Sequence, residues 1–206
     1  MFSLEFDPYT INPILYLSND NRILGNQQTD ITPKRIIGEP NQLRKYYGLI
    51  GNTCVKDKTK VYYEVKFDYK IYTAPKATDL ILEIGLAQRD QIDVNDYLGN
   101  VEKGWSFALA RYRGTSNNVY IRARHEGKLK TNKFYGNNEP GLTVSDKFGI
   151  LIDRERNTFS LTSNKTVIYT YQNVESYCDL CPVFGVHNNN KILDVRLQII
   201  NSTAIT

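Results

Sequence analysis

The stretch Phe148-Gly-Ile-Leu-Ile-Asp153, followed by Arg154-Glu-Arg-Asn157 and Thr158-Phe-Ser-Leu161, decides the fold. Its first six residues are mostly aliphatic or aromatic, which is typical of a buried strand, and the next four are polar and predict a turn. The last four alternate between polar and apolar side chains. Asn157 suits such a turn, because Asn tolerates a positive φ. The stretch predicts a β-hairpin, and we expect four of its side chains in the core: Ile150, Ile152, Phe159 and Leu161.

Alternation of apolar and polar side chains recurs along the chain. It is clearest in Val61–Ile71, where every second side chain is apolar, as in a strand with one buried face and one solvated face. Leu80–Ala87 is apolar almost throughout, as expected in the middle of a sheet. The other predicted strands are Ile14–Leu17, Arg22–Leu24, Gly104–Arg111, Val119–Arg124, Thr166–Tyr171, Leu180–Val186 and Ile192–Ile200.

Polar segments separate these strands. We expect loops at residues 25–45, 88–103 and 125–141, with one helical turn near Gln42–Tyr46. The sequence shows no amphipathic pattern of three or more helical turns. Short strands joined by turns predict an all-β fold, a two-sheet antiparallel β-sandwich with few short helices. Because no linker rich in Pro, Gly or Ser divides the 206 residues, we expect a single domain, 1–206.

The composition narrows the class of function. A net charge of +4 permits an acidic partner but is modest for a dedicated nucleic-acid binder. The chain has fifteen Tyr beside one Trp and one Met. Tyr favours strands and also serves binding surfaces, because its ring is apolar and its tip is polar. The one Trp, Trp105, is expected to pack in the core.

The three cysteines are Cys54, Cys178 and Cys181. Their odd number, with no signal peptide at the start of the sequence, predicts reduced thiols and a cytoplasmic location. We interpret Cys178-Asp-Leu-Cys181 as one or two thiols buried beside a strand, because a metal site would need two further ligands. No stretch reaches the roughly 20 apolar residues of a membrane span.

Motifs for catalysis or cofactor binding are missing from the sequence. It contains no Gly-x-Ser-x-Gly elbow and no Gly-rich phosphate loop. His125 and His187 both fall in predicted loops, without a local signature that pairs either with Ser or Cys. We therefore expect no catalytic residue, no metal and no cofactor. An enzyme or a carbohydrate-binding sandwich would have to use acids that are scattered along the chain, such as Glu83, Asp153 and Asp194.

Several motifs together resemble the B30.2 domain, also called PRY-SPRY. The pieces, in the order in which that family has them, are Phe6-Asp-Pro-Tyr with Leu17-Ser-Asn-Asp20, Tyr47-Gly-Leu-Ile-Gly-Asn52, Val61-Tyr-Tyr-Glu-Val65, Ile84-Gly-Leu-Ala87, Gly104-Trp-Ser-Phe107, the opening hairpin and Leu180-Cys-Pro-Val-Phe184. The second piece is similar to the midline-like branch of the tripartite-motif ubiquitin ligases, which carry such a domain at the C-terminus.

The resemblance implies a jelly-roll type sandwich with a PRY-like part at about 1–45 and a SPRY-like part at about 46–206. It also implies a non-catalytic module for recognising a protein or peptide, the substrate-binding end of a ligase. Such a domain is expected to be monomeric in isolation and away from the membrane, with the parent protein oligomeric through a coiled coil.

The resemblance implies a shallow binding groove lined by loops at one end of the sandwich. On this chain we expect that surface at the exits of the matching strands, because loops on a rigid scaffold generally carry recognition residues. The expected partner-binding residues are Arg111, Tyr112, Arg113, Arg122, Arg124, His187, Asn188, Asn189 and Asn190.

The segment 122–133 supports an alternative function. Five of its side chains are positive and one is a Glu, in a region that we expect to be a loop. Such a segment can steer an acidic peptide, RNA or another polyanion. Binding of RNA or a polyanion would weaken steeply with salt, whereas peptide binding through aromatic contacts would not.

Overall fold

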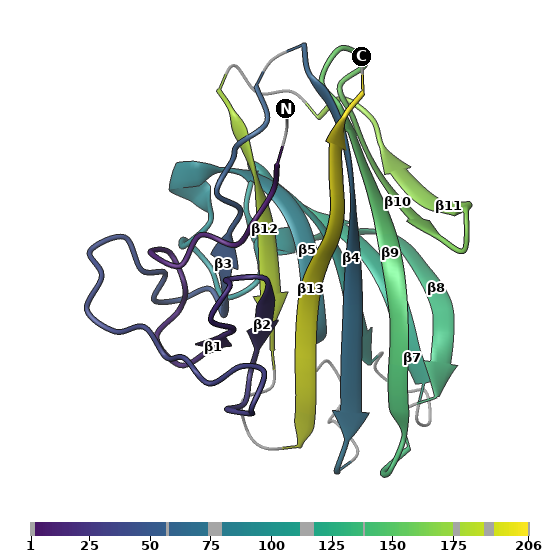
Figure 1. Cartoon of the computed structure of the whole chain (residues 1–206). Helices are drawn as coiled ribbons and strands as arrows, with labels where there is room; N and C mark the ends of the chain where they lie inside the picture. Colours follow the sequence, from purple (N-terminus) through teal and green to yellow (C-terminus); the bar gives the residue numbers. More distant parts are fainter. Residues whose placement is uncertain are drawn as a thin grey trace.

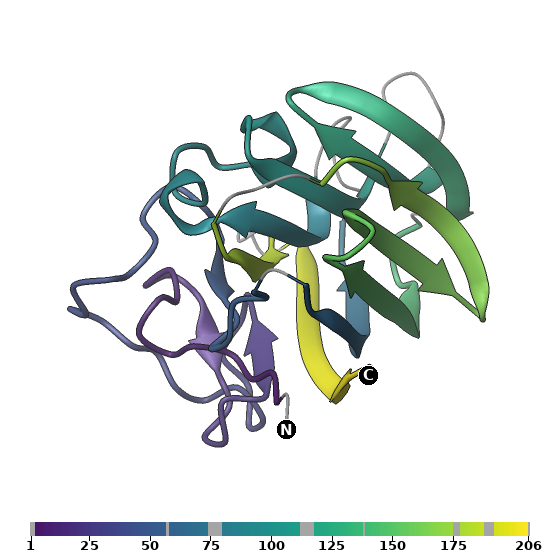
Figure 2. The same cartoon turned by 90° about the horizontal axis from the view of Figure 1, so that it is seen from above.

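The computed structural model describes residues 3–56, 58–73, 80–111, 118–137, 139–174, 178–187 and 192–205. Two antiparallel sheets pack face to face, as Figures 1 and 2 show from two directions. The predicted all-β sandwich is therefore confirmed.

The first sheet has seven strands. In spatial order they are β1 (Tyr16–Leu17), β2 (Ile23–Gly25), β13 (Leu193–Ala204), β4 (Lys60–Ile71), β9 (Thr143–Asp153), β10 (Thr158–Ser163) and β11 (Thr166–Tyr171). All neighbouring strands are antiparallel. The long strands β13, β4 and β9 form its centre.

The second sheet has six strands. In spatial order they are β3 (Gly48–Ile50), β12 (Leu180–Val186), β5 (Leu80–Gln88), β6 (Gly104–Arg111), β7 (Asn118–His125) and β8 (Lys128–Asn137). The described helices are two single 3₁₀ turns, η1 (Arg89–Gln91) and η2 (Leu98–Asn100), which interrupt the predicted loop at 88–103. The helical turn predicted near Gln42–Tyr46 is wrong, since this segment is irregular and has bends at residues 44–46. No described helix is long and apolar enough to cross a membrane.

The hairpin predicted from the sequence is β9–β10. Ile152 faces Phe159 across the ladder, Ile150 faces Leu161, and all four side chains are buried in the core. Asn157 has the positive φ that the turn requires, 52°. The prediction for this hairpin is confirmed.

One core lies between the sheets and is rich in aromatic rings. The apolar side chains of β4 are all buried there, as alternation predicted. The ring centres of Phe67 and Phe148 are 4.6 Å apart within the first sheet, and those of Phe107 and Phe159 are 4.9 Å apart across the two sheets. Trp105 is also buried, as expected. Tilted ring contacts of this kind stabilise a core beyond simple area burial.

A second, smaller core covers the outer surface of β3, β12 and β5. Segments that precede β3 and follow β5 fold over these strands and bury Leu43, Tyr46, Ile92, Leu98 and Val101. Both faces of β5 are therefore covered, which explains its nearly continuous apolar sequence. The outer surface of β6, β7 and β8 contributes no side chain to this second core.

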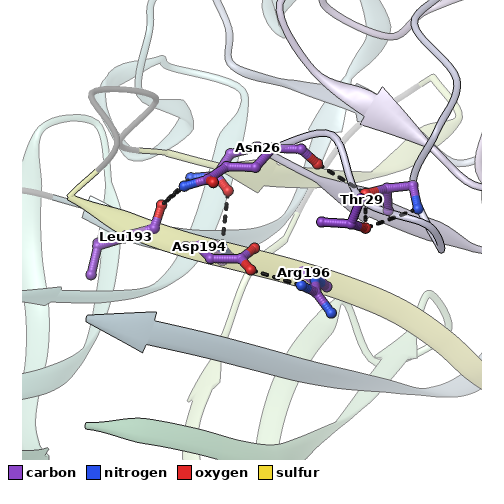
Figure 3. Close-up of polar contacts among 8 residues, drawn as sticks. Asn26, Thr29, Leu193, Asp194 and Arg196 are labelled. Carbon is purple, nitrogen blue, oxygen red and sulfur yellow. Dashed lines mark hydrogen bonds and ion pairs between the residues drawn. The ribbon is translucent and has the colours of Figure 1, made fainter. Parts of the chain in front are cut away.

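The N-terminal segment is attached to β13 by Asn26. Its buried side chain donates from Nδ2 to the carbonyl of Leu193 (3.0 Å) and accepts from the backbone N–H of Val195 (2.9 Å), as a strand residue would (Figure 3). The same Nδ2 lies 3.3 Å from the carbonyl of His187. Asn26 therefore ties the start of β13 to the end of β12.

Cys54 and Cys181 form a disulfide, so the expectation of reduced thiols is wrong for this pair. The two residues are 127 positions apart, and no local pattern connects them. Residues 54–55 run beside the start of β12, where Val55 and Leu180 exchange backbone hydrogen bonds of 2.7 and 3.2 Å. This pairing places the two Cα atoms 4.0 Å apart. The third thiol, Cys178, is exposed.

The predicted loop at 125–141 is also wrong, because most of it is strand β8. A two-residue turn, Glu126-Gly127, joins β7 to β8, and both residues have positive φ (51° and 70°). Such a turn matches the twist of a hairpin. β8 resembles a loop in sequence because it is an edge strand whose side chains are polar and largely exposed.

We expect the disulfide to stabilise the domain. Replacing both Cys54 and Cys181 with Ser should lower the free energy of unfolding by about 2–5 kcal/mol, because a long loop is then released in the unfolded chain. Since a domain of this size loses roughly 2–4 °C per kcal/mol, thermal unfolding should show a fall of about 10 °C. Cys178→Ser is the matched control and should not change the melting temperature. Equal melting temperatures for all variants would contradict the bond.

Candidate functional site

The open outer surface of β6, β7 and β8 gathers basic and aromatic side chains. Along β7, Val119, Ile121 and Ala123 are buried in the core. Because successive side chains of a strand point to opposite faces, the intervening residues face outward. We call this surface the basic–aromatic face and define it by Tyr97, Tyr120, Arg122, Arg124 and Phe134.

Small residues on the neighbouring strand form the floor of this face. Ala110 stands opposite Tyr120, and Ala108 stands opposite Arg122. Neither alanine extends beyond its Cβ, so the longer side chains of β7 stand above β6. The face is therefore built on a paired, rigid sheet.

Arg124 is held by the segment around η2. Its Nη1 donates to Oδ1 of Asn100 (3.2 Å), and its guanidinium lies 5.7 Å from the ring centre of Tyr97. A cation over an aromatic face is attracted by the ring quadrupole. Gly99 permits this approach, because a Cβ there would lie 2.7 Å from the Cβ of Arg124.

Phe134 provides an exposed aromatic ring at the β8 side of the face. Its ring meets Tyr120 edge to face at 6.0 Å, yet 60% of the residue is accessible to solvent. Large exposed aromatics beside arginines are typical of binding hot spots.

A buried carboxylate, Glu83, supports the face from below. It is fully buried and accepts hydrogen bonds from the backbone N–H groups of Leu98 (3.2 Å) and Gly99 (3.3 Å) and from the hydroxyl of Ser106. Nε2 of His187 lies 3.7 Å from the same carboxylate. Glu83 therefore anchors η2, the segment that holds Arg124.

Two tyrosines near Glu83 remain neutral at physiological pH. Burial raises the pKa of Tyr46 well above its usual value, and the negative charge of Glu83 raises it further. Burial and Glu83 also raise the pKa of Tyr97, while Arg122 and Arg124 partly oppose this. Both phenols thus act as neutral polar groups.

The structure brings together only part of the predicted site. Arg122 and Arg124 lie side by side on the outward face of β7. Arg111 is the last residue of β6 and pairs with Val119. It lies two residues after the inward-facing Leu109, so it is on the inner side of the sheet and not on the basic–aromatic face. His187 follows β12 and is 6% exposed, with its ring against Tyr46 and Tyr47 at 6.0 and 6.1 Å. Tyr112, Arg113, Asn188, Asn189 and Asn190 lie outside the described residues.

Sequence reasoning missed two members of the face, Tyr97 and Phe134, and the carboxylate of Glu83 beneath it. Tyr97 and Phe134 come from segments predicted to be loops, and Glu83 was considered only as a scattered acid. An acid inside the apolar run Leu80–Ala87 is a signal that could have revealed Glu83, because a buried charge needs partners. Among the described residues, no group of His, Cys, Asp and Glu could hold a metal ion.

Solved structures share this arrangement of strands. The PSpry domain of TRIM65 aligns with a TM-score of 0.66 at 16% identity, over 97% of this chain and 93% of that domain. The fold is that of a SPRY domain. Stonustoxin aligns with a TM-score of 0.63 at 15% identity, over 97% of this chain and 27% of the toxin. No protein-family model and no curated protein sequence matches the chain. These likenesses establish the SPRY fold and leave the ligand to be argued from the site.

We expect Glu83 to be important for stability. Glu83→Gln keeps the size of the side chain but replaces one acceptor oxygen with an amide that cannot accept the hydrogen bonds made at that position. The free energy of unfolding should fall by about 1–3 kcal/mol, measured by urea denaturation. Glu102→Gln, at an exposed position, is the control and should leave stability unchanged. Equal midpoints for both variants would show that Glu83 does not anchor η2.

Proposed function

We propose that this SPRY-fold domain is a non-catalytic module that binds a protein or peptide through the basic–aromatic face. One observation carries the proposal: Arg122, Arg124 and the exposed Phe134 stand together on two paired strands. Arginine and aromatic residues dominate the energetics of binding surfaces. Here the sheet and the Arg124–Asn100 contact restrict their motion before binding, which lowers the entropic cost.

The chemistry of the face defines the ligand class. Guanidinium groups bind carboxylates, often through two parallel hydrogen bonds, and the ring of Phe134 offers apolar contact. A ligand that combines acidic residues with an aromatic or aliphatic side chain fits both. The net charge of +4 favours the approach of such a ligand.

Three carboxylates that could have supported an enzyme have structural partners. Glu83 accepts from backbone N–H groups, Asp153 lies 3.6 Å from Lys60, and Asp194 pairs with Arg196 at 2.7 Å. Each carboxylate is thus engaged in holding its own strand or turn. This supports the proposal that the chain is a binding module.

The likeness to the TRIM65 PSpry domain supports a further part of the proposal. In a longer protein, this domain would be the substrate-recognition end of a tripartite-motif-type ubiquitin ligase, oligomeric through a coiled coil. We also propose a cytoplasmic location. The Cys54–Cys181 disulfide opposes this location, because such bonds persist mainly in oxidising compartments. If the location is right, alkylation in intact cells should find both thiols reduced, and an intact disulfide would exclude it.

Polyanion binding is the second candidate, because the β7–β8 hairpin concentrates positive charge. Arg122, Arg124, Lys128, Lys130 and Lys133 stand on it. If RNA is the ligand, affinity for a single-stranded oligonucleotide should fall steeply between about 50 and 200 mM salt. A peptide ligand held by aromatic contacts should show a much smaller fall in the same titration.

Substitution on the face tests the peptide proposal. A peptide display screen first provides a ligand, and its affinity is then measured by calorimetry. Arg122→Ala and Arg124→Ala should each weaken binding about tenfold, since a hot-spot residue contributes more than about 1 kcal/mol. Arg89→Ala, at an exposed position on η1, is the matched control and should not change affinity. Unchanged affinity in both test variants would exclude this face as the site.

A further inference from the structure

In the part of the chain that the structure describes, no strand pairs with the outer edge of β8, which can therefore take up a further strand. β8 is the last strand of its sheet and pairs only with β7 among the described residues. The edge strand of the other sheet, β11, lies at the same side of the sandwich (Figures 1 and 2). Backbone N–H and C=O groups along such an edge can pair with an extended segment of another protein.

Two β-bulges define which part of β8 can pair regularly. Arg124 faces Leu129 and Ala123 faces Thr131, so Lys130 is an extra residue. Tyr120 faces Phe134 and Val119 faces Gly136, so Tyr135 is a second extra residue. The regular window between the bulges is Thr131–Phe134. Because bulges bend and twist a strand, they limit an added strand to a short register at this window.

Charge along β8 selects the kind of segment that can add. Lys128, Lys130 and Lys133 are exposed on it, and β8 itself contains no acid. The nearest acid in the turn, Glu126, already lies 4.0 Å from Lys128. Pairing of β8 with β8 of a second copy would bring these lysines together, and their like charges would repel. Exposed lysines commonly protect edge strands from such pairing. An acidic segment would instead be attracted.

A groove beside the window can receive a side chain of the added strand. It has a volume of about 510 Å³, lies between the C-terminal half of β8 and the other sheet, and its wall includes Tyr69, Phe134, Tyr135, Leu142, Val144 and Ile168. The one acid in the wall, Asp146, accepts a hydrogen bond from the hydroxyl of Tyr135 (3.0 Å). Every second side chain of an added strand would face the space between the sheets, where this apolar wall lies.

We propose that the β8 edge is a second docking surface, which takes up an extended acidic segment of a partner protein as an added strand. The acidic side chains are attracted to the exposed lysines at the β8 edge, and one aromatic or large aliphatic side chain enters the groove. This surface shares Phe134 with the basic–aromatic face but does not include the guanidinium groups of Arg122 and Arg124, so it does not depend on the function proposed for them.

A synthetic peptide provides a direct probe of strand addition. We would use fluorescein-labelled Glu-Val-Glu-Phe-Glu-Val-Glu and measure binding to the whole chain by fluorescence anisotropy. The same peptide with N-methyl groups on alternate amides keeps its charge and side chains but loses backbone hydrogen bonds. Its affinity should be at least about tenfold lower for one of the two N-methyl patterns, because one edge of the peptide pairs with β8. Equal affinity for the parent peptide and both patterns would overturn strand addition.

Charge reversal on β8 tests the position. Lys130→Glu and Lys133→Glu should each weaken the binding of the parent peptide about fivefold. Lys56→Glu changes the net charge equally at an exposed position before β4, and it should have a smaller effect. An equal loss in all three variants would show unspecific attraction and overturn the site. A concentration-dependent dimer that disappears when the peptide binds would also overturn the proposal, because a second copy of the chain would then occupy the β8 edge.

One further variant separates the two surfaces. Arg122→Ala combined with Arg124→Ala should leave affinity for the parent peptide within about twofold, while it abolishes binding of the ligand selected on the basic–aromatic face. If the double variant loses binding of both ligands, the peptide binds on that face and the β8 proposal is overturned. If the double variant still binds both ligands, the function proposed for the arginines is overturned and the β8 edge remains supported.

Discussion

Packing of the two inner sheet faces is the constraint on which the rest of this molecule depends. Phe107 of β6 meets Phe159 of β10 across the sandwich, and Phe67 of β4 meets Phe148 of β9 within the seven-stranded sheet. Once these rings are inside, the twofold alternation of a strand determines what points outward. On β7, burial of Ile121 and Ala123 puts Arg122 and Arg124 on the outer face. The basic–aromatic face is therefore a consequence of how the core is filled.

The outer surface of the six-stranded sheet is divided into a covered half and an open half. A second small core covers β3, β12 and β5, while β6, β7 and β8 present basic and aromatic side chains. Glu83 lies at the boundary, where its carboxylate holds η2 beside Arg124. A buried carboxylate is costly unless it is hydrogen-bonded, so Glu83 is sensitive to any shift of η2. The same group that stabilises the covered half thus positions the open half.

The two edge strands of the six-stranded sheet differ in length, cover and charge. β3, at one edge of the six-stranded sheet, is three residues long and lies beneath the second small core. β8, at the other edge, is long, bulged and lined with lysine. Bulges and lysines disfavour pairing between copies, yet the positive charge is compatible with an acidic strand. Selectivity at this edge would arise from repulsion as much as from attraction.

The sequence by itself determined the strands that have one buried face, because their alternation is local and follows from burial. The β9–β10 hairpin, including the turn at Asn157, and the inward face of β4 were predictable for this reason.

Tertiary structure alone decided three further features. The Cys54–Cys181 bond joins residues 127 positions apart, and their proximity depends on where β12 pairs. β8 shows no apolar alternation because an edge strand on an open side buries little. Arg124 meets Tyr97 and Asn100 where Glu83 holds η2 over the sheet, a contact between three separate stretches of the chain. Local periodicity reports burial, but it carries no information on which distant segments come together.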